Sequence, residues 1–174
     1  ICHEAGLDDL LSDLSVHHLD LILSDRPMPP GMGVKAFNHF LGSSAVSFFA
    51  AENIAPDYQD NFPQSLDSAP MLLPLSNNPL RHQLDEWFLA NKISPRVIAE
   101  LDDSALLKAF GGASQGLFPA PKVIADEIAA MYSAVEIGCV PQLTESFYAI
   151  SSERKLKHPA VSMLCESAKH HFFK

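Results

Sequence analysis

The segment Glu100–Ser104 holds the residues of this sequence that are best placed to bind a ligand: two adjacent carboxylates followed by a hydroxyl. They stand between a predicted strand and the start of an amphipathic helix. At such junctions in α/β sheets the first helical amides are free, and they attract ligands as well as capping side chains. Asp103 or Ser104 can cap the helix, and for Asp103 capping and ligand binding both stay open. Capping explains Asp102 less well, so Asp102 is the better ligand candidate.

Histidines and cysteines are the other groups that could do chemistry. The adjacent pairs His17-His18 and His170-His171 lack the i, i+4 spacing of a helical metal site, and no HExxH motif occurs. Surface histidines are the favoured interpretation, with sensing of pH as the alternative. The three cysteines form no Cys-x-x-Cys pair, so reduced, buried thiols in a cytosolic protein are the favoured interpretation, with a redox or metal role as the alternative. Because GxSxG, GxGxxG and GxxxxGK motifs are also absent, the sequence predicts neither an enzyme nor a resident cofactor.

The charge of the chain argues against nucleic acid as a direct partner. Twelve basic residues stand against twenty-one acidic ones, for a formal charge of −9, whereas DNA binding needs clustered Lys and Arg. Since 47% of the 174 residues are hydrophobic, we expect a packed core. No apolar run approaches the ~20 residues of a membrane span, and no signal peptide is evident. The opening ICHEAG resembles mid-domain sequence, so the start of the chain says little about targeting. The sparse cysteines and the lack of a membrane span lead us to expect a cytoplasmic protein with no membrane contact.

Hydrophobic periodicity predicts alternating helices and short strands. Helices are predicted from Leu7, from Pro79 with Asn77 or Asn78 as N-cap, after Asp103, near 122–131, and from Pro159 with Val161, Leu164, Ala168 and Phe172 on one side. Strands are predicted at 19–24 (buried on both faces), 45–51, 71–75, 96–101, 116–118, 134–137 and 147–150. Gly111 and Gly112 should end the helix after Asp103, one of them in a left-handed conformation.

This alternation predicts an α/β fold with mostly parallel sheets. The chain is expected to form two lobes, the first from residues 1–48 and 148–174 and the second from residues 49–147, joined by two crossing strands. Ligands of such sheets bind beyond the carboxyl ends of the strands, so the segment Glu100–Ser104 is expected in the second lobe's ligand site.

Three stretches resemble the effector domain of LysR-type transcriptional regulators: HHLDLILSDRP, LLKAFGGASQGLFPAP and YAISSERKLKHPAVSMLCE. The resemblance covers nearly the whole chain. It implies two Rossmann-like lobes joined by two crossover strands, as in type II periplasmic binding proteins, and a homodimer or tetramer. It further implies that DNA is bound through a winged helix-turn-helix that this chain lacks. Helices 7–16 and 80–89 are the candidate dimer contacts.

The resemblance also implies which residues touch a small effector or cation between the lobes. Carried over by matching segment, they are Ser24, Asp25, Ser47, Asp102, Asp103 and Ser104. Oxygen ligands suit a small hard cation, and Asp25 and Asp102 are the candidate sodium ligands. Backbone carbonyls could make the sodium site instead, and Asp25 could pair locally with Arg26.

Within the family, segments such as AVSFFAAE, ELDDSALLKAFG and ERKLKHPAV resemble a regulator that activates expression of a sodium/proton antiporter. We therefore expect the signal-sensing domain of a transcriptional activator that responds to sodium and pH. The alternative is a solute-binding protein of a transporter with the same two-lobed fold.

Overall fold

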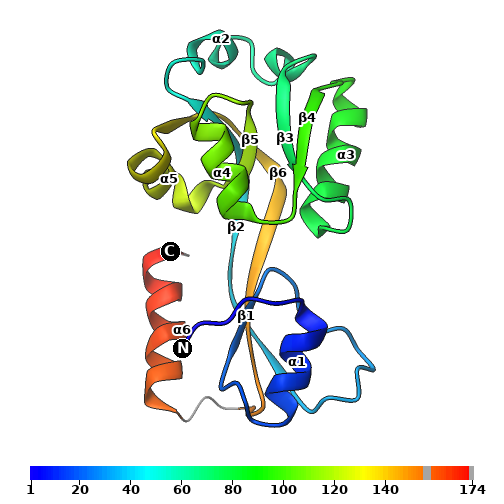
Figure 1. The fold of residues 1–174 in the computed structure, drawn as a ribbon, viewed down its shortest axis with the longest axis vertical. Coiled ribbons are helices and arrows are strands. Elements are labelled where there is room, and N and C mark those ends of the chain that lie inside the picture. The colour runs from blue at the N-terminus through cyan, green and yellow to red at the C-terminus, as the bar shows by residue number, and fades with distance from the viewer. Residues whose placement is uncertain (155–157, 173–174) are drawn as a thin grey trace. The chain divides into compact units, whose positions relative to one another are not determined.

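A computed structural model describes residues 1–154 and 158–172, and the chain divides into two compact units. Unit 1 comprises Ile1–Ser43 and Ser146–Lys174, and unit 2 comprises Ser44–Glu145. The chain passes between them inside two long strands, β2 (Phe37–Ala51) and β6 (Ala134–Ser151) (Figure 1). These strands are the middle pair of a sheet with the order β1-β6-β2-β5.

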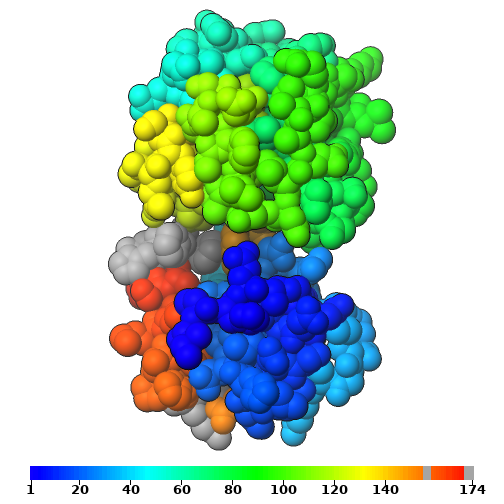
Figure 2. Space-filling view, in the orientation of Figure 1, coloured from blue at the N-terminus to red at the C-terminus, as the bar shows by residue number. Residues whose placement is uncertain are grey.

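Unit 1 is a small sheet with a helix on each face (Figure 1). Strand β1 (Ile22–Ser24) pairs antiparallel with the end of β6, Ile22 opposite Ile150. Helix α1 (Leu7–Ser15) packs its buried leucines against Ile22 and Ile150, while α6 (Pro159–Phe172) packs against Ala149 through Cys165. Neighbouring strand residues point to opposite faces, so the two helices cover opposite sides of the sheet. Both helices lie at the surface of unit 1, blue and orange-red in Figure 2.

Two predictions in unit 1 are wrong in detail. The strand predicted at 19–24 is shorter, and it is not buried on both faces because Leu23 is 56% exposed. On α6, Leu164 is 45% exposed, whereas its neighbour Cys165 is 5% exposed and faces the sheet. A change of one residue turns a helix position by about 100°, so a short apolar run fixes the buried face poorly.

Unit 2 contains a parallel strand pair and an antiparallel one. Strand β3 (Pro70–Pro74) runs parallel to β4 (Arg96–Leu101), and β5 (Phe118–Pro121) runs antiparallel to β2. The helical elements are α2 (Pro56–Gln59), η1 (Gln64–Leu66), α3 (Pro79–Asn91), α4 (Ser104–Gly112), η2 (Lys122–Ile124) and α5 (Ala125–Tyr132).

The core of unit 2 lies on both faces of its strands. On one face Phe48 packs with Leu84 and Phe88 of α3. On the other, Phe49 packs with Phe118 and with Leu107 of α4. Consecutive residues of β2 therefore serve opposite layers, and α3 and α4 cover opposite faces of the unit.

The expectation of mostly parallel sheets is wrong, since β1–β6 and β2–β5 are antiparallel pairs. Hydrophobic patterns show where strands are but not which way their partners run. The strands predicted at 134–137 and 147–150 are one continuous strand, β6, whose middle is partly polar and reads as a break. The strand predicted at 116–118 begins at Phe118, and Leu117 makes only a bridge to Met71.

The glycines of α4 do not adopt the left-handed conformation that was predicted; Ser114 does, with φ of 62°. Gly111 is buried, and a Cβ there would overlap the ring of Phe118. A Cβ at Gly112 would overlap the carbonyl oxygen of Tyr132. Both glycines therefore permit close packing of α4 rather than an unusual backbone angle.

Candidate functional site

The candidate site is the place where the parallel strands of unit 2 end. Strand β3 ends at Pro74 and β4 at Leu101, and Leu75 N donates a hydrogen bond to Leu101 O over 3.2 Å just beyond the ladder. The helices that follow, α3 and α4, cover opposite faces of the unit. Ligands of α/β sheets bind outside adjacent strand ends whose following helices diverge in this way. We name the segments 75–78 and 102–104 the carboxyl edge.

Two side chains of the carboxyl edge cap helices. Asn78 Oδ1 accepts from Leu80 N at 2.8 Å at the start of α3. Asp103 Oδ1 accepts from Ala105 N at 2.6 Å and from Leu106 N at 3.3 Å at the start of α4. Of the two interpretations that the sequence left open for Asp103, the structure shows the capping contact.

Asp102 and Ser104 are the exposed polar groups beside the cap. Ser104 Oγ accepts a hydrogen bond from Lys108 Nζ at 3.2 Å, one turn further along α4. Burial lowers the pKa of Lys108, although the charges of Glu145 and Asp103 oppose that shift. The edge thus presents an exposed carboxylate and a hydroxyl, with a partly desolvated ammonium beside the hydroxyl.

The side chain of Arg81 contacts the ends of both strands at the carboxyl edge, β3 and β4. Its Nη1 donates to Pro74 O at 3.0 Å and to Glu100 Oε1 at 2.6 Å, and its Nε contacts the carboxylate of Asp85 at 3.0 and 3.1 Å. The side chain is only 13% exposed. Burial alone would lower the pKa of Arg81, but the hydrogen bonds and charges of Glu100 and Asp85 outweigh it and raise the pKa.

Ser47 lies elsewhere in unit 2, within β2, and is fully buried. Its hydroxyl donates to Glu136 Oε1 at 2.9 Å, and Lys122 Nζ is 3.6 Å from the same oxygen. Nearby on β2, Ser44 Oγ accepts from Val123 N at 3.0 Å. These contacts tie β2 to β6 and to η2, so a ligand at Ser47 would have to compete with Glu136 for its hydroxyl.

Ser24 and Asp25 belong to unit 1 and follow β1. Ser24 Oγ accepts from Arg26 N at 3.2 Å, as in a local turn, and Asp25 is exposed. The structure therefore groups Asp102, Asp103 and Ser104, places Ser47 with Glu136, and holds Ser24 and Asp25 in the other unit.

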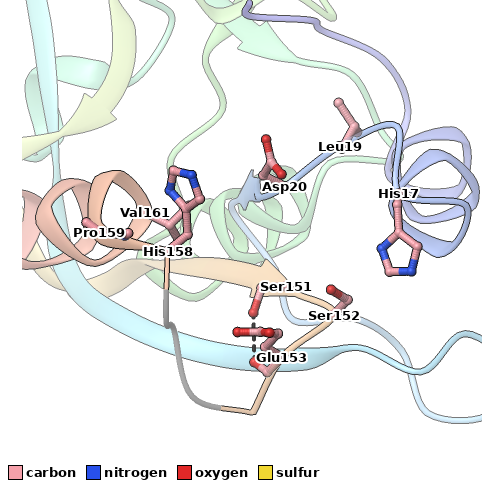
Figure 3. A pocket seen from close by; sticks show the side chains of 9 residues that line it. All are labelled: His17, Leu19, Asp20, Ser151, Ser152, Glu153, His158, Pro159 and Val161. Atoms are coloured by element: carbon pink, nitrogen blue, oxygen red, sulfur yellow. Dashed lines mark hydrogen bonds between the residues drawn. The ribbon is translucent and has the colours of Figure 1, made fainter.

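Unit 1 also contains an open pocket of about 510 Å³ that the sequence did not predict (Figure 3). Its wall comes from the end of α1, the end of β6 and the start of α6, and includes His17, Glu153 and His158. Ser151 Oγ donates to Glu153 O at 2.9 Å, and His39 Nε2 lies 3.0 Å from Ser151 Oγ and 3.2 Å from Glu153 O. Because a carbonyl oxygen only accepts, Nε2 of His39 carries a hydrogen.

Sequence reasoning gave no ligand role to segment 75–78. The signal was present, because β3, Asn78 and Pro79 repeat the strand, cap and helix order of β4, Asp103 and Ser104. Among the side chains of residues 1–154 and 158–170, no group of three His, Cys, Asp or Glu is arranged to hold a metal ion. The same part of the chain has no helix with the length and apolar character of a membrane span. The side chains of His171 and Phe172, which the sequence analysis also named, lie outside the part described.

The chain matches the family described as LysR substrate binding domain over residues 2–173. It therefore belongs to the LysR-type transcriptional regulators, as a ligand-binding regulatory domain and not as an enzyme, which confirms the resemblance and the two-lobed α/β class inferred from the sequence.

The similar curated proteins are transcriptional activators. The transcriptional activator protein NhaR of Escherichia coli strain K12 is 34% identical over 166 residues, which is 95% of this chain and 54% of that protein. NhaR of Shigella flexneri gives the same values. The chain thus spans about half the length of the curated relatives it matches.

Solved structures share the fold at low identity. A putative LysR family regulator of Pseudomonas aeruginosa has a TM-score of 0.70 and 15% identity, over 99% of this chain and 59% of that one. The effector binding domain of QuiR in complex with shikimate has a TM-score of 0.63 and 16% identity, over 97% and 78%. DarR of Vibrio fischeri, solved in complex with DNA, has a TM-score of 0.67 and 17% identity, over 95% and 55%.

Proposed function

We propose that this chain is the effector-binding part of a LysR-type activator that regulates sodium/proton antiporter genes in response to sodium and pH. The observation that carries the proposal is the 34% identity to NhaR across 95% of the chain. The regulator would bind DNA through a further domain, since the chain itself has a net charge of −9, and would work as a homodimer or tetramer. The family match favours this role over a transporter's solute-binding protein.

The carboxyl edge supports a cation as the effector. Asp102 is exposed, whereas Asp103 is engaged as a helix cap. Sodium is a hard cation that binds oxygen ligands. The carboxylate of Asp102 and backbone carbonyl oxygens of the two loops would supply such ligands. Asp25, exposed after β1 in unit 1, is a separate candidate carboxylate for sodium. The ion would act by binding one arrangement of the regulator more tightly than another.

A chimera tests the proposal. The NhaR segment that this chain does not cover would be joined to the chain, and a reporter would be placed under the antiporter promoter. We expect NaCl to raise expression more than KCl at equal ionic strength, and the difference to change between about pH 7 and about pH 8.5. Asp102→Ala should weaken the sodium response, while Asp126→Ala, an exposed aspartate in the first turn of α5, should not. Equal reporter expression in NaCl and KCl would show that the regulator does not respond specifically to sodium.

A further inference from the structure

We propose that Arg81 is a positioning residue of the effector site: its guanidinium sets the spacing of the two loops that form the carboxyl edge. The inference rests on the proposed function in taking that edge as the place where the effector binds. Arg81 lies in the first turn of α3 and is not itself offered as a ligand.

The contacts of Arg81 reach both strands that end at the edge and its own helix, α3. Pro74 is the last residue of β3, and Glu100 is the penultimate residue of β4. Asp85 lies one turn further along α3, so the guanidinium is fixed from its own helix while it contacts both strands. Segment 75–78 starts directly after Pro74, and Asp102 stands two residues after Glu100. A displacement of the guanidinium would therefore move both loops.

The shape of the guanidinium matters here as well as its charge. Nη1 and Nε donate in different directions, to a carbonyl and two carboxylates, from a side chain that is 13% exposed. Lysine would keep the positive charge but would offer a single ammonium on a flexible stem, which cannot reproduce the planar fork. Arg81→Lys thus separates positioning from charge.

Among the described residues, the ion pair of Glu100 with Arg81 and the cap made by Asp103 leave Asp102 as the carboxylate of 100–103 without a hydrogen bond or ion pair. Arg81 neutralises Glu100 at 2.6 Å and contacts Asp85 at 3.0 Å. In its absence the uncompensated carboxylate of Glu100 would compete with Asp102 for a cation. The same residue would therefore fix both the geometry and the charge of the site.

Amide hydrogen exchange of the ligand-free chain, read residue by residue by NMR, tests the positioning role. Leu75 N, bonded to Leu101 O, reports on the edge, and Leu72 N, bonded to Leu117 O, reports on the middle of β3. Arg81→Lys and Arg81→Met should each speed exchange at Leu75 by about tenfold and leave Leu72 within about twofold. The matched control is Arg96→Lys, an exposed arginine at the opposite end of β4.

Two results would overturn the inference. An Arg81→Lys protein that exchanges like the wild type would show that charge alone suffices. Equal acceleration at Leu75 and Leu72 would show only a general loss of stability. Arg81→Lys keeps the test decisive if Arg81→Met does not fold.

The NaCl response of the chimera forms a second arm. We expect Arg81→Lys to raise the NaCl concentration for half-maximal expression by about threefold or more, with Arg96→Lys unchanged. An unchanged midpoint in Arg81→Lys would overturn the inference. Absence of any sodium response in the wild type, with the Leu75 result as expected, would reject the proposed effector and leave the positioning role standing.

Discussion

Replacing Asp103 by alanine should weaken unit 2, because the carboxylate caps α4. The short bond to Ala105 N, at 2.6 Å, carries most of the cap, since the contact to Leu106 N is 3.3 Å. Loss of an N-cap costs about 1 kcal/mol. Loss of a negative charge at a helix start costs about 0.5 kcal/mol more. We therefore expect Asp103→Ala to lower the free energy of unfolding of unit 2 by about 1.5 kcal/mol.

Urea denaturation followed by tryptophan fluorescence measures this loss in the relevant unit. Trp87 is the only tryptophan of the chain and packs with Phe48 and Phe88 in the core of unit 2, so its emission reports on that unit. With a urea m-value of about 1.5 kcal/mol per M, the midpoint should fall by about 1 M. An unchanged m-value would show that the variant unfolds from the same compact state.

Two variants make the experiment specific to capping. Asp103→Ser keeps a capping oxygen and should recover most of the loss, whereas Asp102→Ala should stay within about 0.5 kcal/mol of the wild type. If Asp103→Ala and Asp102→Ala were equally stable, or serine gave no recovery, the assignment of Asp103 as the cap would be refuted.

Packing, thiol burial and lysine burial each give a further measurable outcome. Gly111→Ala should destabilise unit 2 by about 1–3 kcal/mol in the urea assay, with part of the loss recovered by adding Phe118→Leu; a tolerated alanine would contradict the packing. Iodoacetamide should label exposed Cys2 at least about tenfold faster than Cys165, whose pKa is raised by burial. Mass spectrometry after timed quenching measures the two labelling rates. Equal rates would show that the face of α6 that carries Cys165 is not packed against the sheet. The lowered pKa of Lys108 means that the unfolded chain binds more protons just below the ordinary value of 10.5, so stability should gain with rising pH there. Lys108→Met should remove that gain just below pH 10.5, and equal slopes of stability against pH in the wild type and the variant would contradict the prediction.

Local chemistry predicted the helices of this protein well. The spacing of Leu7, Leu11 and Leu14 gave α1, and Asn78 before Pro79 gave the start of α3, because caps and periodic apolar residues act within one turn. The full length of β2 was not predicted. Its first half is half-exposed and polar, with Asn38 and His39, so no run of buried residues marks it.

The sequence did not predict which helices and strands pack or pair with one another, because these contacts join residues far apart in the chain. A glycine is needed at position 111 because the ring of Phe118, from β5, packs against α4 there. No residue within α4 indicates that contact. The direction of pairing between β2 and β5 is of the same kind. For Ser47 the sequence gave a polar position on a crossing strand, but its engagement by Glu136 depends on residues 89 apart along the chain.

The three acidic residues of the segment Glu100–Ser104 have different contacts in the structure. Glu100 pairs with Arg81 and Asp103 caps α4, whereas Asp102, exposed like both of them, has no hydrogen bond or ion pair within the described residues. Roles that the sequence could not separate are thus separable by experiment: loss of Asp103 should change stability, and loss of Asp102 should change the response to an effector. If Asp102→Ala altered stability as much as Asp103→Ala did, this division of roles would be wrong. Asp102 would then be a structural residue, and the main argument for a ligand site at the carboxyl edge would be lost.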